Sequence, residues 1–318
     1  MEGNCDDRKF LSVGLLCLDI IFKTDGFPKE DSDQRCTDQV WQRGGNASNS
    51  STVISLFGSP CELFGTMAVA PETTFLEENL AKYGIGYPNM VYHENCQCPT
   101  SVCIVNNHNG SRTILHTNKN LPELTEDDFS KIDLNSGRYK WIHFEGRPTA
   151  SQIKGMLQKI DDFNKSVEKP EDRITTSVEL EKIREQLVLL QDMADYVFIS
   201  KDHAMFRGFQ TAEEAVDGFH RLCRPGAAVI CAWGEKGACG KGPDGKLVQV
   251  AAYPQEKVVD TLGAGDTFNA STILALSRGY SLQEALDFGC FVAGAKCGMM
   301  GFDGIKELKH NILDNLPL

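Results

Sequence analysis

Short apolar runs alternate with stretches of helical spacing along most of the chain. The apolar runs predict buried strands at 10–21, 141–145, 174–178, 196–200 and 228–233. Helical periodicity predicts helices at 47–56, 150–163, 181–192, 211–222, 265–277 and 281–298. Strands that alternate with helices are typical of a mostly parallel sheet with helices on both faces. The pattern therefore predicts an α/β fold.

Two segments do not follow this alternation. The segments 33–43 and 99–117 indicate exposed strands, and Asn109 followed by Gly110 is a hairpin turn signal in the second. Hairpins added to a parallel sheet often serve as a lid. A lid with bare edges can be covered by a second copy of itself. We therefore predict one domain, residues 1–318, with the two segments inserted in it as a β lid.

The composition is ordinary for a globular protein, with 41% hydrophobic and 24% charged residues among 318. The net charge of −12 has no basic block beside it, which argues against a nucleic acid or a membrane surface as partner. No apolar run reaches the roughly 20 residues of a membrane span, and the start MEGNCDDRKF resembles no secretory or transit signal. The twelve cysteines are scattered, so we expect reduced thiols and a cytoplasmic location.

The segment DTLGAGDTFNAS at 260–271 places a carboxylate, Asp266, directly behind three small residues. A helix N-cap at Asp266, with glycines that permit the turn, would explain this without any ligand. A dinucleotide-binding loop is excluded because Phe268 stands at its third glycine position. A P-loop is excluded because Gly242 follows Lys241 where Ser or Thr is needed.

The same segment also suits phosphoryl transfer. Backbone N–H groups at a glycine-rich helix start point outward, and the helix dipole adds positive charge. Such donors stabilise a transferring phosphoryl group, so Gly263, Ala264 and Gly265 would form an anion hole. Asp266 would orient the attacking hydroxyl and take its proton. Phosphoryl transfer passes through a loose transition state, so the proton of the attacking hydroxyl can be removed late in the reaction. The base therefore needs no strongly raised pKa.

Several motifs carry a resemblance to a known family. DTLGAGDTFNAS resembles the C-terminal signature of the ribokinase-type (phosphofructokinase-B) carbohydrate kinases, and RGGNASNSSTVISLFG at 43–58 resembles the N-terminal one. VWQRGGNASNS, KWIHFEGR and KCGMMGFDGI extend the resemblance toward the fructose-phosphorylating members. It implies a ribokinase-like three-layer fold with a β-clasp lid. It also implies transfer of the γ-phosphoryl group of ATP to O1 of fructose, giving fructose 1-phosphate and ADP.

The resemblance also implies a role for individual residues. Asp266 matches the catalytic base and the turn at 263–265 the anion hole. The matching sugar contacts are Asp19, Gly45, Asn46, Asn49 and Asp266. Asp19 would stand at the end of the first strand, where open α/β sheets place ligands. Without the resemblance, Asp19 would be a turn residue and Asn46 a helix N-cap.

A further set of residues matches the ATP contacts of the family. Arg112, on the lid, matches a residue that meets ATP phosphates, although a hairpin arginine is also an ordinary solvated charge. Cys290 matches a residue of the adenine pocket, although a core cysteine would look the same. The full set is Arg112, Gly234, Glu235, Lys236, Gly237, Gly263, Ala264, Gly265, Asp266 and Cys290.

The chain departs from the family at the metal. The Asn-x-x-Glu motif is replaced by SKDHA at 200–204, so we expect no protein ligand for Mg²⁺, which ATP and water would carry. Lys201 is a candidate for adding positive charge toward the ATP phosphates. Glu145 and Arg147 follow the second predicted strand and are expected at the same edge of the sheet. A K⁺ ion near the anion hole is a further family trait. The β-clasp implies a homodimer in which Asp31 reaches the partner's sugar site.

Two other functions are compatible with these residues. A related kinase could act on ribose, another sugar or a nucleoside, because few contacts decide the substrate. A sugar sensor could keep the fold without catalysis. Asp266 together with an intact turn at 263–265 argues against the sensor, since a pure binder needs no such pair.

Overall fold

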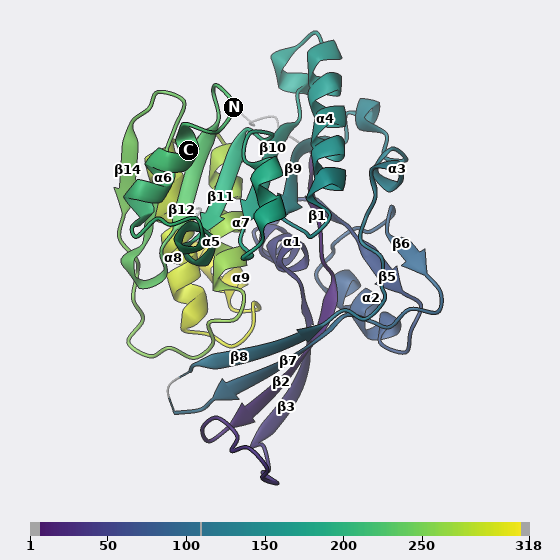
Figure 1. The fold of residues 1–318 in the computed structure, drawn as a ribbon, viewed down its shortest axis with the longest axis vertical. Helices are drawn as coiled ribbons and strands as arrows, with labels where there is room; N and C mark the ends of the chain where they lie inside the picture. The colour runs from purple at the N-terminus through teal and green to yellow at the C-terminus, as the bar shows by residue number, and fades with distance from the viewer. Residues whose placement is uncertain (1–6, 109, 313–318) are drawn as a thin grey trace.

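The structure, a computed structural model, describes residues 7–108 and 110–312. Within them, the main element is an eight-stranded sheet with the order β14-β13-β12-β11-β10-β9-β1-β4 (Figure 1). Strands β12 to β4 in this order are parallel, and β13 and β14 form an antiparallel edge. The strands are β1 (Lys9–Val13), β4 (Cys61–Phe64), β9 (Tyr139–Glu145), β10 (Thr175–Leu180), β11 (Tyr196–Ser200), β12 (Ala228–Ala232), β13 (Ala238–Lys241) and β14 (Leu247–Val250).

Helices cover both faces of this sheet and make it the middle of three layers. One face carries α4 (Ala150–Ser166), α5 (Lys201–Phe206) and α6 (Ala212–His220). The other carries α1 (Asn46–Leu56), α7 (Ala264–Ser277) and α8 (Leu282–Cys297). The shorter elements are β5 (Thr66–Ala68), α2 (Thr73–Lys82), β6 (Val91–His93), α3 (Glu126–Phe129), η1 (Leu134–Ser136), η2 (Pro170–Asp172), η3 (Glu185–Leu190), η4 (Gly234–Lys236) and α9 (Ile305–Ile312).

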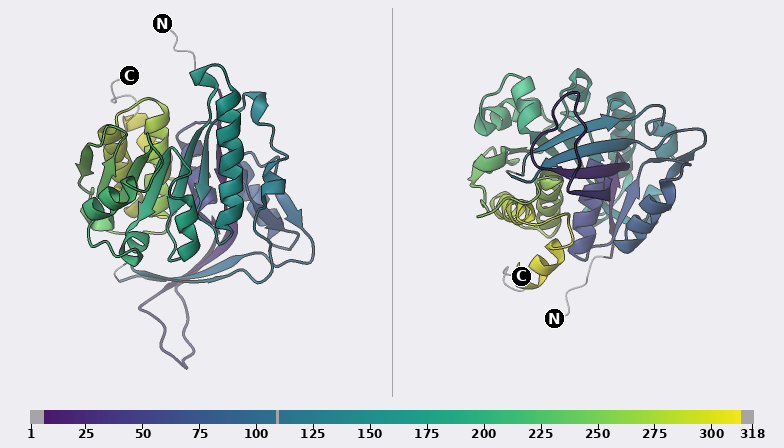
Figure 2. Two further views of the ribbon diagram at one scale, coloured as in Figure 1. Left: turned by 45° about the horizontal axis from the view of Figure 1, so that its top comes forward. Right: turned by 90° about the horizontal axis from the view of Figure 1, so that it is seen from below.

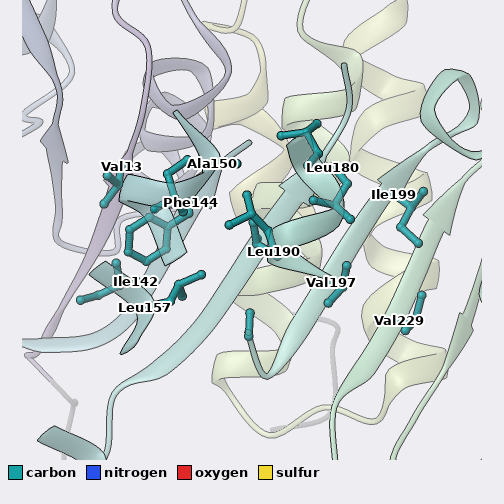
Figure 3. Close-up of a cluster of buried hydrophobic side chains, with 14 of the residues drawn as sticks. Val13, Ile142, Phe144, Ala150, Leu157, Leu180, Leu190, Val197, Ile199 and Val229 are labelled. Atoms are coloured by element: carbon teal, nitrogen blue, oxygen red, sulfur yellow. The ribbon is translucent and has the colours of Figure 1, made fainter. Parts of the chain in front are cut away.

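The core lies on both sides of the sheet because successive strand residues point to opposite faces. In β11, Val197 and Ile199 belong to the cluster under α4 and α6, and Phe198 belongs to the cluster under α1, α7 and α8. Figure 3 shows part of the first cluster, which includes Phe144 of β9 and Leu157 of α4. These buried runs are the ones that the apolar pattern predicts.

A second sheet forms the lid below the carboxyl ends of the parallel strands (Figures 1 and 2). Its order is β3-β2-β7-β8, from β2 (Cys17–Thr24), β3 (Asp38–Gly44), β7 (Thr100–Asn106) and β8 (Arg112–Thr117). The loop between β2 and β3 projects from the body in Figure 2. Of the expected hairpin turn, Asn109 lies outside the described residues, and Gly110 has the positive φ of 68° that such turns use.

Three expectations from the sequence are wrong. The run 10–21 is not one strand, because β1 ends at Val13 and the chain enters the lid as β2 four residues later. At the break, a Cβ on Gly14 would lie 2.7 Å from the Cβ of Glu145, and the Leu15 N–H donates to Glu145 Oε2 at 2.9 Å. The segment 33–37 is not a strand, since β3 begins only at residue 38.

The helix expected at 181–192 is the third error. Only the 3₁₀ helix η3 forms there. Ser200 Oγ donates to the carbonyl of Glu181 at 2.9 Å, and His203 Nδ1 lies 2.9 Å from the carbonyl of Lys182. In these tertiary contacts the carbonyls of Glu181 and Lys182 accept from side chains, whereas in an α-helix they would accept from backbone N–H groups of the next turn. The other predicted strands and helices are confirmed, with small shifts at their ends.

Candidate active site

A cavity of about 850 Å³ lies between the carboxyl ends of the parallel strands and the lid. The main sheet lines it with Glu145 and Glu179 from β9 and β10. The lid lines it with Asp19, Ser101 and Arg112. Ligands of open α/β sheets bind beyond the carboxyl ends of the strands. The position of the cavity is thus the expected one for a ligand site.

The start of α7 forms one wall of the cavity. Gly263 is its N-cap in the left-handed conformation, with φ of 75°, and a Cβ there would lie 2.5 Å from the Phe302 ring. Gly265 differs, because a Cβ there would meet no atom within 4 Å. The Ala264 N–H donates to the Thr261 carbonyl at 3.3 Å. Among the hydrogen bonds of the described residues, none uses the N–H groups of Gly265 and Asp266.

Asp266 is the third residue of α7 and is buried at the cavity wall. Its side chain is not the helix cap, since that position belongs to Gly263. Asp266 Oδ2 instead accepts a hydrogen bond from Asn49 Nδ2 at 2.8 Å. Burial raises the pKa of Asp266 to about 7, with help from Glu181 and against the hydrogen bond from Asn49. Burial thus brings the pKa of this carboxyl group into the range that suits a general base at neutral pH.

The N-terminus of α1 brings two asparagines to the same wall. Gly45 precedes the helix with φ of 99°, and a Cβ there would lie 2.2 Å from the carbonyl oxygen of Leu15. Asn49 is buried, and its Oδ1 has no hydrogen-bond partner among the described residues. Asn46 is the first helical residue and does not cap the helix, contrary to the simplest expectation. Its amide donates to the carboxylates of Glu179 and Glu181.

Asp19 reaches the cavity from the lid. The sequence predicted Asp19 at the end of the first strand. It lies instead inside β2, which pairs with β3 and β7. Burial raises the pKa of Asp19, while hydrogen bonds with Ser101 and Cys17 lower it. A Cβ on Gly44 would lie 2.2 Å from Asp19 Oδ2. The glycine therefore gives the carboxylate its place beside the cavity.

Three carboxylates gather where β9 and β10 end. Glu145 Oε2 accepts the N–H groups of Leu15 and Ala47 at 2.9 and 3.3 Å. Burial acts to raise the pKa of Glu145, but the neighbouring Arg147 holds it below its usual value. Burial raises the pKa of Glu179 well above its usual value, and the charges of Glu181 and Asp266 add to this.

Glu145 was expected at this site from the sequence, whereas Glu179, Glu181 and Asn269 were not. Asn269 Nδ2 donates to Glu179 Oε1 at 2.8 Å, so Glu179 connects the first residue of α1 with the second turn of α7. A signal for these acids was present, since they stand at the carboxyl end of the third predicted strand. It was obscured because Glu181 was assigned to a helix start.

The residues expected to bind ATP fall into two groups. Arg112 donates from β8 to Thr261 Oγ1, next to the glycine-rich turn. The stretch 234–237 forms η4 and the glycine after it, and it does not line the cavity. Cys290 is buried in α8, also outside the lining. The expected residues that the cavity brings together are Asp19, Gly45, Asn46, Asn49, Arg112, Gly263, Gly265 and Asp266.

Other expected residues lie near this group. Glu145 and Arg147 line the cavity, as expected from their strand. Lys201 does not line it, and its Nζ lies 3.4 Å from Glu235 Oε1. Among the described residues, no group of three or more His, Cys, Asp or Glu side chains is placed to hold a metal ion.

Comparison with known proteins identifies the family of the chain. The sequence model of the pfkB family carbohydrate kinases matches residues 7–305. The chain belongs to this family. Ketohexokinase of Mus musculus is 49% identical to this pfkB family member over 300 residues, which cover 94% of this chain and 99% of the mouse protein.

Solved structures support the same fold. Ribokinase from Giardia lamblia has a TM-score of 0.82 at 13% identity, covering 97% of this chain and all of that one. Arabidopsis thaliana ribokinase, solved with ribose and ATP, has a TM-score of 0.76 at 19% identity, covering 96% and 98%. The ribokinase-like three-layer fold predicted from the motifs is confirmed. In the part of the chain that the structure describes, no helix has the length and apolar character that a membrane crossing requires.

Proposed function

We propose that this pfkB family kinase uses ATP to phosphorylate fructose at O1, giving fructose 1-phosphate and ADP. The observation that carries the proposal is the near full-length match, at 49% identity, to a protein named ketohexokinase. The site adds chemical support. A buried carboxyl group, whose pKa is raised to about 7, stands beside backbone N–H groups at a helix start that have no partner among the described residues.

Asp266 is proposed as the base for the attacking hydroxyl. Its contact with Asn49 fixes one carboxylate oxygen, which leaves the other to accept the sugar O1–H. A base works best when its pKa lies near the working pH, and burial brings Asp266 there. Asn49 Oδ1, buried without a protein partner, is suited to accept from another sugar hydroxyl. Asp19, on the lid side, is proposed as a second acceptor for the sugar.

The N–H groups of Gly265 and Asp266 are proposed to receive the phosphoryl oxygens. They stand at the positive end of the α7 dipole, where negative charge is stabilised. Preorganised donors of this kind lower the barrier because charge on the phosphoryl group is held without reorganisation. Arg112, which already reaches Thr261 beside the turn, is placed to pair with other phosphate oxygens.

Two cations, Mg²⁺ and K⁺, bear on this proposal. Mg²⁺ is proposed to arrive as part of the MgATP substrate. For K⁺, oxygens beside the turn are the relevant ligands, but the carbonyl and carboxylate of Asp260 both accept from the Lys296 ammonium group. These oxygens do not fit a K⁺ site, and we derive no step through this ion. Rates in potassium chloride compared with choline chloride test this, and equal rates are expected.

The variant Asp266→Ala tests the proposal. We expect fructose to bind with near wild-type affinity in calorimetry, while the phosphorylation rate falls by about 10²–10⁴ because a positioned base is lost. Wild-type rates with fructose, ribose and adenosine provide the comparison. Preferred turnover of ribose or adenosine would replace fructose as the substrate, and an unchanged rate in the variant would remove Asp266 from the mechanism.

A homodimer through the lid is part of the proposal. The edge strands β3 and β8 expose Val40, Trp41, Ile114 and Leu115, and exposed sheet edges invite pairing with another chain. Asp31, in the projecting loop, is proposed to reach the sugar site of the partner subunit. Sedimentation of the wild type and of Trp41→Asp tests this, with a dimer and a monomer expected. A monomeric wild type would refute it.

A cytoplasmic location is also proposed. The cysteines of the described residues are free thiols, which suits a reducing compartment. Fractionation of cells that express the chain tests this, and recovery with membranes or in the medium would contradict it.

A further inference from the structure

The most deeply buried charge in the structure has no place in the mechanism described so far. Lys296, in the last turn of α8, is 0% exposed. Its Nζ donates to the Asp260 carbonyl at 2.9 Å and to Asp260 Oδ2 at 2.7 Å. A buried ion pair seldom stabilises a fold more than apolar side chains of the same size would. Its presence therefore calls for a reason other than stability.

Asp260 connects this lysine to the turn that begins α7. Its Oδ1 accepts the N–H of Leu262 at 2.9 Å, and its Oδ2 also accepts the N–H of Gly301 at 3.1 Å. The carbonyl of Cys297 accepts the N–H groups of Val259 and Asp260. The backbone leading into the turn is thus fixed to the end of α8 at several points.

Phe302 completes the connection from the other side. The Lys296 ammonium lies 5.5 Å from the centre of its ring. The same ring packs so closely on Gly263 that a Cβ there would lie 2.5 Å from it. Lys296 therefore interacts with both groups that position Gly263: it hydrogen-bonds to Asp260, which precedes Gly263 in the chain, and lies over the ring of Phe302, which packs against Gly263.

We propose that Lys296 is a positioning residue for phosphoryl transfer, which it serves by holding the turn at 260–263 through Asp260 and Phe302. The N–H groups of Gly265 and Asp266 follow this turn, so their direction depends on it. The inference rests on the proposed function of that turn. Lys296 acts at a distance from the reacting atoms, and it is expected to affect phosphoryl transfer more than sugar binding.

The test compares Lys296→Met with the double variant Lys296→Met plus Asp260→Asn. The single variant leaves a buried carboxylate unpaired and is expected to melt at a lower temperature. The double variant removes both charges and is expected to regain most of the melting temperature. In both variants kcat should fall by about 100-fold, the effect of a small misplacement of a catalytic group, while the KM for fructose stays near that of the wild type.

A matched control uses an ion pair outside the cavity. Lys241 Nζ lies 2.7 Å from Asp217 Oδ1, between β13 and α6, and neither residue lines the cavity. The pair Lys241→Met plus Asp217→Asn should keep the wild-type kcat. A double variant at 260 and 296 that regains both melting temperature and kcat would assign the pair a structural role only and overturn the inference. A double variant with a raised KM for fructose and an unchanged kcat would also overturn it.

Nucleotide binding separates this inference from the proposed function. Calorimetry with the non-hydrolysable analogue AMP-PNP should show about tenfold weaker binding in the double variant, the equivalent of one lost hydrogen bond. Unchanged AMP-PNP affinity would overturn the inference. A wild-type protein that does not phosphorylate fructose would refute the proposed function, and the AMP-PNP affinities would still decide the role of Lys296.

Discussion

Gly265 offers the sharpest separation of stability from catalysis. In the variant Gly265→Ala the new Cβ would meet no protein atom within 4 Å. The residue stands in the first turn of α7, where alanine in place of glycine stabilises by about 0.4–1 kcal/mol. The methyl group would, however, project where a phosphate must approach the N–H. Loss of one such donor costs about 10²–10³ in kcat, or roughly 3–4 kcal/mol of transition-state binding.

The assay combines thermal unfolding with steady-state kinetics on fructose and ATP. We expect Gly265→Ala to melt at the wild-type temperature or at most a few degrees above it, which is the shift that about 1 kcal/mol of stabilisation produces. We expect kcat to fall. Gly263→Ala is the contrast, because its φ of 75° and the Phe302 ring should make it unstable as well as inactive. Full activity in Gly265→Ala would refute the anion-hole role.

Three further predictions follow from the same site. Because the pKa of Asp266 is raised to about 7 and the base acts deprotonated, kcat/KM should rise about tenfold per pH unit below 7 and level off above; a rate that stays flat down to pH 5 would contradict this. Asn49→Ala removes the hydrogen bond that lowers the pKa of Asp266, so the midpoint of that profile should move to higher pH. Arg112→Ala should raise the KM for ATP by roughly 10-fold or more, the value of a charge-assisted bond, with an unchanged melting temperature because Arg112 is exposed; a lower melting temperature would indicate a structural role instead.

Local pattern was sufficient for most of the main sheet. The runs that became β9, β11 and β12 were recognised because central parallel strands are buried on both faces and appear as continuous apolar stretches. The motif at 260–271 alone suited an anion site but also a simple helix N-cap, and the resemblance to the kinase family favoured the anion site. The resemblance added the sugar residues, which composition and spacing could not assign.

Local pattern failed where tertiary contacts override it. The run 10–21 is apolar throughout, yet Gly14 and Glu145 make the chain leave the main sheet and continue in the lid. Likewise, the pattern near 181 predicted a helix, but the carbonyls of Glu181 and Lys182 are contacted by Ser200 and His203 instead. Neither contact can be read from the neighbouring sequence, because the partners lie far along the chain.

The sequence by itself determined the class of fold, the family and the place of the turn that we propose binds phosphate, since each is carried by motifs of residues close together in the chain. Only the tertiary structure decided that Asp266 is buried against Asn49 and that Glu179 connects α1 with α7. It alone also placed Lys296 behind the turn. Burial and charge pairing set the pKa and the position of these groups, and both arise from segments that meet only when the chain is folded.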